Sequence, residues 1–385
     1  MNRREFVQTS ALGITVLLAN GCSSHAGDAE MELELAPGPA AEDIRWRVLR
    51  YAVRAPNSHN TQPWLVDLRR EGELDLYVDR SRLLPQTDPP ARQIHISQGT
   101  FLELLTLAAA AFGYGAEVKY FPRGQYSSPE VADLPVATVV FHPDATAPRD
   151  PLFGEIPKRY TNKRNYDPTV PLTAAQVAAI QAAPGSQRFP LLMISEAQPR
   201  QTLTQICHEA MQIETSGAAR NRETGQWFRF SDQEARQKRD GFSVAHNGTT
   251  GIRKWVAETF LLSRKSVDDP KGMFARLAAD AVREQAHSAP AFAALVSTAN
   301  TRLDQVLVGR AYARLQLAGI QAGLFMHPFS QVLEEYPEMA ELQGRFKQAL
   351  GVAPEHTVQM FFRIGQAQPS PHTLRRDVHS LVRSA

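Results

Sequence analysis

The stretch Ala55-Pro-Asn-Ser-His-Asn-Thr-Gln-Pro-Trp64 places a row of polar side chains between two prolines. Before it, apolar residues recur at helical spacing over 44–52, and Pro56 ends that helix because proline lacks an amide donor and disfavours helical geometry in the preceding residue. After it, apolar and polar residues alternate over 64–69, which predicts a half-buried strand. The decapeptide therefore connects a helix to a strand.

If this connection is extended, Ser58, Asn60 and Gln62 share one side of it. Two carboxamides and a hydroxyl offer donors and acceptors together, which suits a planar heterocycle better than a phosphate. The alternative is an ordinary polar turn, because Asn and Ser are common turn residues. The complete decapeptide favours a binding cradle, because it closely resembles the Ala-Pro-Ser-x-x-Asn-x-Gln-Pro-Trp signature of the FMN-dependent nitroreductase family.

A faint internal repeat divides the chain. Gly99 is followed by Leu105, Leu107, Ala108 and Gly113, and Gly309 is followed at identical spacings by Leu315, Leu317, Ala318 and Gly323. Each set predicts a helix of small residues, 100–112 and 310–322, and each is followed by a β-type run, 135–141 and 357–363. A chance match between two buried helices is the alternative, but a second correspondence between 48–58 and 177–186 favours a true repeat.

The second half begins with a basic segment. Arg159, Thr161 and Arg164 combine two fixed cations with a hydroxyl, a set that can hold a phosphate dianion through charge-assisted hydrogen bonds. A solvated basic turn is the alternative. The segment resembles the family's Arg-x-Ser-x-Arg-x-Phe phosphate motif, and the same resemblance implies that Arg375 or Arg376 supplies the last phosphate-binding arginine.

In the nitroreductase family two subunits share each FMN, whereas here both sets of motifs lie in one chain. The first half, 42–150, keeps the cradle, and the second half, 151–385, keeps the phosphate motif and the turn Pro328-Phe329-Ser330, whose backbone N–H the family places near flavin N5. The resemblance therefore implies an α+β, three-layer fold in which two half-repeats form a pseudo-dimer, as in the single-chain Acg-like branch. It also implies one FMN per chain and a monomer.

Between the halves' motifs, the segment 201–288 fits neither repeat. It mixes arginines with aromatics, but acidic residues cancel the positive field, which favours a lid over the flavin rather than a nucleic-acid surface. Trp227 or Phe230 either covers the flavin ring or anchors the lid to a small core of its own. The formal net charge of +2 also argues against nucleic acid, and no cluster of His and Cys suggests a metal.

The N-terminus resembles a twin-arginine export signal. Arg3 and Arg4 precede an apolar run too short to span a bilayer, so 1–26 is expected to be a signal and 27–41 a tether. Cys22 is a candidate lipidation site, with cleavage after Ala26 as the alternative. We therefore expect a periplasmic protein, free or anchored to the membrane through a lipidated Cys22.

These features together predict an exported FMN-dependent oxidoreductase with hydride or electron transfer at flavin N5 and no catalytic side chain. One alternative is an FMN-storage protein with a closed lid, and another is an interaction domain that has lost its flavin. The export signal predicts slow reduction by NAD(P)H, which is not expected outside the inner membrane. The sequence indicates neither the substrate nor the electron donor.

Overall fold

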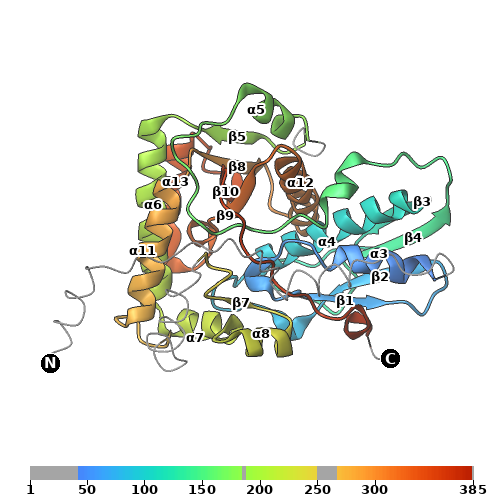
Figure 1. The fold of residues 1–385 in the computed structure, drawn as a ribbon. Coiled ribbons are helices and arrows are strands. Elements are labelled where there is room, and N and C mark those ends of the chain that lie inside the picture. The colour runs from blue at the N-terminus through green and yellow to red at the C-terminus, as the bar shows by residue number, and fades with distance from the viewer. Residues whose placement is uncertain (1–41, 184–187, 249–266, 384–385) are drawn as a thin grey trace, which may run out of the picture.

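The computed structural model describes residues 42–183, 188–248 and 267–383 (Figure 1). The predicted signal, the tether and Cys22 lie outside these residues. In the part of the chain that the structure describes, no helix combines the length and apolarity needed to span a bilayer.

The first half contains two helices and an antiparallel four-stranded sheet. Its elements in chain order are α3 (Ile44–Ala52), β1 (Trp64–Asp67), β2 (Glu73–Val78), α4 (Arg92–Ala111), β3 (Tyr114–Tyr120) and β4 (Ala137–Pro143). The strand order is β1-β2-β4-β3. The Asp43 side chain accepts a hydrogen bond from the Arg45 N–H at 2.9 Å, which fixes the start of α3. Trp64 and Val66 of β1 are fully buried, as the alternation of that segment predicts.

The second half repeats this order. Its matching elements are α5 (Ala174–Gln181), β5 (Leu191–Ile194), β8 (Ala291–Ser297), α12 (Arg302–Gln321), β9 (Phe325–Pro328) and β10 (Thr357–Gly365), with α13 (Ala340–Leu350) added before β10. The strand order β5-β8-β10-β9 is that of the first sheet, and all its pairings are antiparallel. The predicted α+β fold of two half-repeats is confirmed. Short 3₁₀ helices complete the chain: η2 (Ser58–Asn60), η3 (Arg80–Arg82), η4 (Pro151–Glu155), η6 (Gln331–Leu333), η7 (Pro337–Met339) and η8 (Val378–Leu381).

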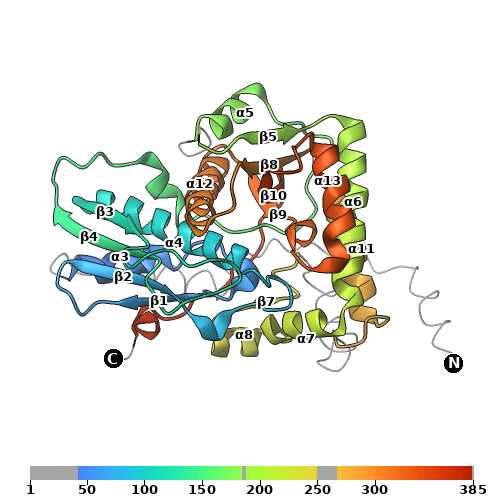
Figure 2. The same ribbon diagram turned by 180° about the vertical axis from the view of Figure 1, so that it is seen from behind.

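Helices α4 and α12 form the layer between the two sheets, and they cross at the repeated glycines (Figure 2). A Cβ atom on Gly99 would lie 1.8 Å from the Val306 carbonyl oxygen, and one on Gly309 would lie 2.0 Å from that of Ile96. Any side chain at either position would push the helices apart. The repeat therefore preserves a close helix contact.

Both central helices begin earlier than predicted, at Arg92 and Arg302, because the fold buries polar side chains in their first turns. These two arginines are equivalent in the repeat. Arg92 donates to the Leu333 carbonyl at 2.7 Å, and Arg302 donates to the Pro90 carbonyl at 2.7 Å. The first turn of each central helix is thus hydrogen-bonded to the other half of the chain. This pair of arginines was not among the residues predicted from the sequence.

A long insertion separates β5 from β8, where the first half has only a short turn between β1 and β2. It contains α6 (Ala197–Ser216), α7 (Ala218–Trp227), β6 (Phe228–Arg229), α8 (Asp232–Lys238), β7 (Phe242–Ser243) and α11 (Met273–His287). Helices α6, α11 and α13 stand side by side at one end of the molecule, while α7 and α8 run along one edge (Figures 1 and 2). This arrangement places the insertion against both halves.

The end of the second half returns to the first half. After β10 the chain crosses to β1, where the Arg383 N–H donates to the Val66 carbonyl at 2.9 Å and Val382 pairs with Val66 in parallel. The tail thereby passes the connection that precedes β1. This route brings residues near 375 to the cradle.

Candidate functional site

A cavity of about 570 Å³ lies where the two halves and the insertion meet. Most of the predicted site residues line it, namely Ser58, Asn60, Arg159, Thr161, Pro328, Phe329, Ser330 and Arg375. The predicted residues Gln62, Arg164 and Arg376 are not part of its lining. A volume of this size is typical of pockets for cofactors and small molecules, roughly 300–1,000 Å³.

The cradle is not extended, which corrects the prediction that Ser58, Asn60 and Gln62 share one side. Residues 58–60 form η2, and His59, Asn60 and Gln62 adopt left-handed φ values of 49°, 52° and 52°. Such values are unfavourable for residues other than glycine, and they concentrate at binding sites. The sharp bend sends Ser58 and Asn60 into the cavity and turns Gln62 away from it.

Asn60 presents an unsatisfied acceptor to the cavity. Its side-chain amide donates to the carbonyls of Gly241 at 2.9 Å and Leu374 at 3.1 Å, whereas its Oδ1 atom is buried without a hydrogen-bond partner in the described structure. A buried acceptor without a partner costs free energy unless a ligand satisfies it. Asn60 therefore fits a ligand that offers an N–H group.

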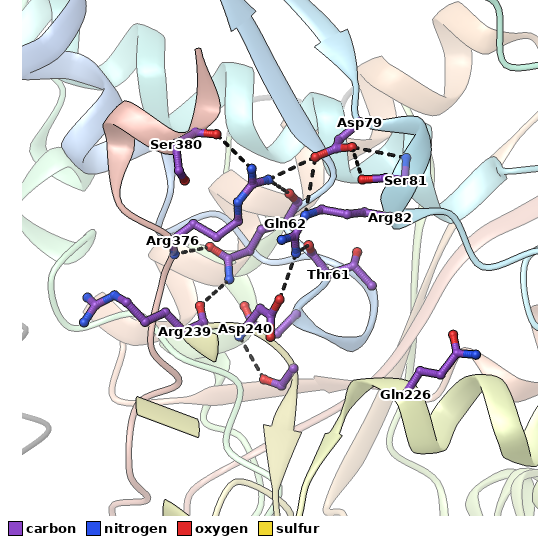
Figure 3. A network of polar contacts seen from close by, with 12 residues as sticks. Thr61, Gln62, Asp79, Ser81, Arg82, Gln226, Arg239, Asp240, Arg376 and Ser380 are labelled. Atoms are coloured by element: carbon purple, nitrogen blue, oxygen red, sulfur yellow. Dashed lines mark hydrogen bonds and ion pairs between the residues drawn. The ribbon is translucent and has the colours of Figure 1, made fainter. Parts of the chain in front are cut away.

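Gln62 and Arg376 lie outside the cavity lining and brace the cradle (Figure 3). The fully buried Gln62 donates to the Arg239 carbonyl at 2.8 Å and accepts from the Arg376 N–H at 2.7 Å. The Arg376 guanidinium donates to the Gln62 carbonyl at 3.1 Å and pairs with Asp79 at 3.3 Å. These contacts fasten the insertion and the tail to the segment before β1, and the predicted cofactor contacts of Gln62 and Arg376 stay a prediction.

Three buried arginines cluster at one end of the cavity, and two of them, Arg159 and Arg375, line it. Arg159 donates to Gln316 Oε1 at 2.8 Å and to the Arg54 carbonyl at 2.8 Å, and Arg375 donates to the Val53 carbonyl at 2.8 Å. Arg54 donates to a ring nitrogen of His372 at 3.2 Å. Among the described residues, no carboxylate forms an ion pair with any of these three guanidinium groups. They are held in place by neutral acceptors alone.

Burial lowers the pKa of Arg159 to about 9 and that of Arg54 to about 10, and it holds the pKa of Arg375 well below the ordinary value. Mutual repulsion lowers the pKa of Arg159 and Arg375 further. Clustered cations that burial destabilises in this way are stabilised by a bound anion. The geometry is suited to a phosphate group.

The segment that follows Arg159 contributes differently from the prediction. Thr161 lines the cavity, but the side chain of Arg164 does not. The Arg164 backbone N–H donates to Asn162 Oδ1 at 3.0 Å, and its carbonyl accepts from the buried Arg363 at 2.7 Å. Arg164 thus fixes the course of the segment through its backbone, and its contact with a phosphate stays a prediction.

The predicted turn Pro328-Phe329-Ser330, at the end of β9, has few backbone N–H groups available to a ligand. Proline has no N–H, and the Phe329 N–H donates to the Phe361 carbonyl at 2.9 Å. Of the three predicted turn residues, only Ser330 keeps an N–H that a ligand can use.

Comparison with known proteins gives the family. Over 352 residues the chain is 27% identical to a protein from Mycobacterium tuberculosis strain H37Rv with the provisional name NAD(P)H nitroreductase Rv3131, covering 89% of this chain and 92% of that protein. The chain belongs to the nitroreductase family. Over 80 residues it is 34% identical to the acg protein of the same strain, also provisionally named an NAD(P)H nitroreductase, covering 21% of this chain and 24% of that one. No family model matches the chain.

Solved nitroreductase structures resemble this chain only loosely. A nitroreductase from Anabaena variabilis, provisionally so described, is 12% identical, covers 88% of this chain and 91% of its own, and superposes with a TM-score of 0.43. The FMN-dependent nitroreductase NfnB from Mycobacterium smegmatis, solved with NADPH, is 14% identical, covers 60% of this chain and 96% of its own, and has a TM-score of 0.35.

Four residues in or beside the cavity were missing from the site predicted from the sequence: Lys163 and His246 line the cavity, whereas Arg54 and His372 do not. Lys163 donates to Asn247 Oδ1 at 3.0 Å, and burial lowers its pKa to about 8. Burial also lowers the pKa of His246 to about 4 and that of His372 to about 3, so both rings are neutral at pH 7. Arg54 directly precedes the cradle motif and could have been noticed. The two histidines come from the insertion and the tail, and no local pattern marks them.

The two alternatives for the aromatic residues of the insertion are now distinguished. Trp227 and Phe230 pack against a small core of Phe228, Phe242 and Val244 and do not line the cavity. Phe228 and Phe242 themselves line it. Trp227 and Phe230 therefore anchor the insertion, and their neighbours form the cavity wall.

Proposed function

We propose that this chain binds one FMN in the cavity and acts as an oxidoreductase of the nitroreductase type. The observation that carries the proposal is the set of three buried arginines, Arg54, Arg159 and Arg375, which lack a carboxylate partner among the described residues. An FMN phosphate would satisfy them. The names of the relatives and the FMN described with several solved neighbours support the same assignment.

The residues present fit this cofactor. Arg159, Arg375 and Thr161 offer donors for a phosphate, the unpartnered Oδ1 atom of Asn60 fits an N–H at the edge of a planar heterocycle, and the Ser330 N–H is an additional donor. FMN, when bound, supplies the hydride or electron transfer of the reaction. The chain's own contribution is to bind and orient the cofactor and to exclude water. No side chain is assigned as a catalytic acid.

Two observations bear on the identity of the electron donor, and they disagree. The relatives are named after NAD(P)H, whereas the predicted export signal places this protein where NAD(P)H is not expected. The lining carboxylates Asp280 and Glu284 on α11 favour a donor other than NAD(P)H, because they repel the phosphates of a dinucleotide. We therefore propose slow reduction by nicotinamides and a different physiological donor.

Storage of FMN is a second candidate function, favoured by the way the insertion is fastened. The turn before β7 is tied to the cradle by the Gly241 N–H, which donates to the Asn60 carbonyl at 3.1 Å. Next to it, Asp240 pairs with Arg82 at 2.9 Å and with the buried Arg229. These contacts close the insertion over the cavity and favour retention of a bound flavin.

The visible spectrum of the purified protein tests the proposal and separates the two functions. We expect a flavin spectrum that bleaches slowly with NADPH and fully with dithionite. If an artificial acceptor then reoxidises the flavin repeatedly, the protein is an oxidoreductase; a flavin that stays reduced in the presence of nitroaromatic acceptors supports storage. A preparation that stays colourless after incubation with FMN would overturn both.

The proposal of twin-arginine export has its own experiment. Replacement of Arg3 and Arg4 by lysine should leave the protein in the cytoplasm, and Cys22→Ser should release it from the membrane fraction if the cysteine is lipidated. Cell fractionation followed by immunodetection gives both results. Unchanged export of the double lysine variant would contradict this part of the proposal.

A further inference from the structure

The cavity extends beyond its arginine end into a region that the insertion forms. We call this region the lid chamber and define it by Glu214, Thr224, Phe228, Phe242, Phe274 and Val282. These residues come from α6, α7, β6, β7 and α11, whereas the arginine end is built from residues near 54, 159 and 375. The two ends therefore have different walls and different polar groups.

The Glu214 side chain lies in this chamber. The residue is 5% exposed, and its Oε2 atom is buried with no hydrogen-bond partner among the residues that the structure describes. Within the described ranges, no cation forms an ion pair with its carboxyl group. Because an isolated buried carboxylate is costly, this group needs either a proton or a cationic ligand.

The two cations that act electrostatically on the Glu214 carboxyl group, Arg220 and Lys163, form their hydrogen bonds with other groups. Arg220 donates to the backbone carbonyls of Glu214 and Ile213, both at 3.0 Å, and pairs with Glu338 at 3.4 Å. Lys163 donates to Asn247 Oδ1 at 3.0 Å, with its ammonium 4.8 Å from the centre of the Phe242 ring. Neither is bonded to the Glu214 carboxyl group, so the structure leaves room for a cation from a ligand.

The charged groups around Glu214 set the protonation of its carboxyl group. Burial raises its pKa to about 7; Arg220, a hydrogen bond with the Gln331 side chain and Lys163 oppose this rise, and Glu223 adds to it. Glu214 in turn contributes to the raised pKa of the buried Glu334. With this raised pKa, the fraction of Glu214 in the carboxylate form increases as the pH rises through about 7.

The chamber walls are aromatic. The Phe228 ring meets those of Phe242 and Phe274 edge to face, at centroid distances of 5.6 Å and 6.0 Å. Phe228 and Phe242 are buried. Such walls favour a planar aromatic body, which can stack on or meet the edges of these rings. The Thr224 hydroxyl, which is also buried and has no hydrogen-bond partner among the described residues, offers a second polar contact.

We propose that the lid chamber binds a planar aromatic molecule that carries a protonated amine, and that Glu214 determines this specificity through a charge-assisted contact. The conclusion that this ligand is a substrate rests on the proposed function. The existence of the binding site does not, because the site is built from groups on α6, α7 and α11 that are not assigned to flavin binding.

The test compares three ligands that share a 4-nitrophenyl ring with a one-carbon substituent. Isothermal titration of the full chain should give at least about tenfold tighter binding for 4-nitrobenzylamine than for the neutral 4-nitrobenzyl alcohol, and the weakest binding for the anion 4-nitrobenzoate. The preference for the amine should rise as the pH rises through about 7, because the carboxylate form of Glu214 then grows. Equal affinities for amine and alcohol across this pH range would overturn the proposal without any variant.

Glu214→Gln should remove the preference for the amine and its pH dependence while leaving the affinity for the alcohol within about twofold. Glu209→Gln is the matched control, because Glu209 is a half-buried carboxylate on the same helix that already pairs with Arg345 at 2.9 Å. This variant should retain the preference. A preference retained in Glu214→Gln would overturn the assignment.

Flavin content, measured on the same samples, separates this inference from the proposed function. If the protein fails to bind FMN but shows an amine preference that depends on Glu214, the proposed function fails and the binding site stands. If the protein is loaded with FMN and shows no preference, the inference fails and the proposed function stands.

Discussion

Replacement of Arg159 by methionine distinguishes the effect of this residue on FMN affinity from its effect on the stability of the fold. Arg159 is 2% exposed and its donors contact Gln316 and the Arg54 carbonyl. Methionine has a similar length but no charge. We expect the variant to lose FMN affinity while the flavin-free protein becomes more stable.

The magnitude follows from burial. Burial lowers the pKa of Arg159 from 12.5 to about 9, so below pH 9 the folded protein carries the full cost of holding this cation. That cost is on the order of 5 kcal/mol at about 1.4 kcal/mol per pH unit. Two lost hydrogen bonds cost about 1–2 kcal/mol each, which leaves a net gain of about 1–3 kcal/mol for the flavin-free variant at pH 7. Loss of one charge-assisted bond to the phosphate should weaken FMN binding by about 10- to 100-fold.

Two assays measure these effects. Guanidinium unfolding of flavin-free protein gives the stability, and addition of inorganic phosphate should raise it more in the wild type than in the variant. Arg345→Met, on an exposed arginine, is the control and should change neither quantity. A flavin-free Arg159→Met protein that is clearly less stable than the wild type, with an unchanged response to phosphate, would refute the reasoning.

Further predictions concern the central helices, the cradle and the insertion. Gly99→Ala should lower the unfolding free energy by about 1–3 kcal/mol, because its Cβ would lie 1.8 Å from a backbone oxygen, whereas Gly344→Ala, with nothing within 4 Å, should not. In flavin titrations Asn60→Ala should weaken FMN binding by about 0.5–1.5 kcal/mol. Gln62→Ala should mainly lower the stability measured in denaturant, because it leaves the Arg239 carbonyl and the Arg376 N–H unpaired. Asp240→Asn, which weakens the pairs with Arg82 and Arg229, should speed flavin release about tenfold, measured by the recovery of free-flavin fluorescence after dilution; an unchanged rate would argue against the insertion as the retaining element.

The sequence was most informative where a single structural requirement explains why a particular residue type occupies a position. The matched glycines predicted an architectural repeat, and the structure explains them by a helix crossing that leaves no space for a side chain. The decapeptide likewise located the cavity. In both cases the spacing along the chain reflects a backbone requirement.

The sequence was least informative about the direction of side chains. Gln62 carries the same carboxamide as a ligand-binding residue, but a left-handed φ at 62 turns it toward Arg239 and Arg376. Nothing in composition or alternation predicts that bend. Glu214 was seen only as one of several charges in the insertion, because its isolation depends on where Arg220 and Lys163 place their donors.

The central claim is that buried arginines hold the phosphate of a single FMN. Titration of flavin-free protein with FMN and, separately, with riboflavin tests it most directly, because riboflavin has the same ring but no phosphate. We predict saturation at one FMN per chain and at least about 100-fold weaker binding of riboflavin, since more than one charge-assisted bond is lost. Equal affinity for the two flavins, or saturation near two per chain, would contradict the account.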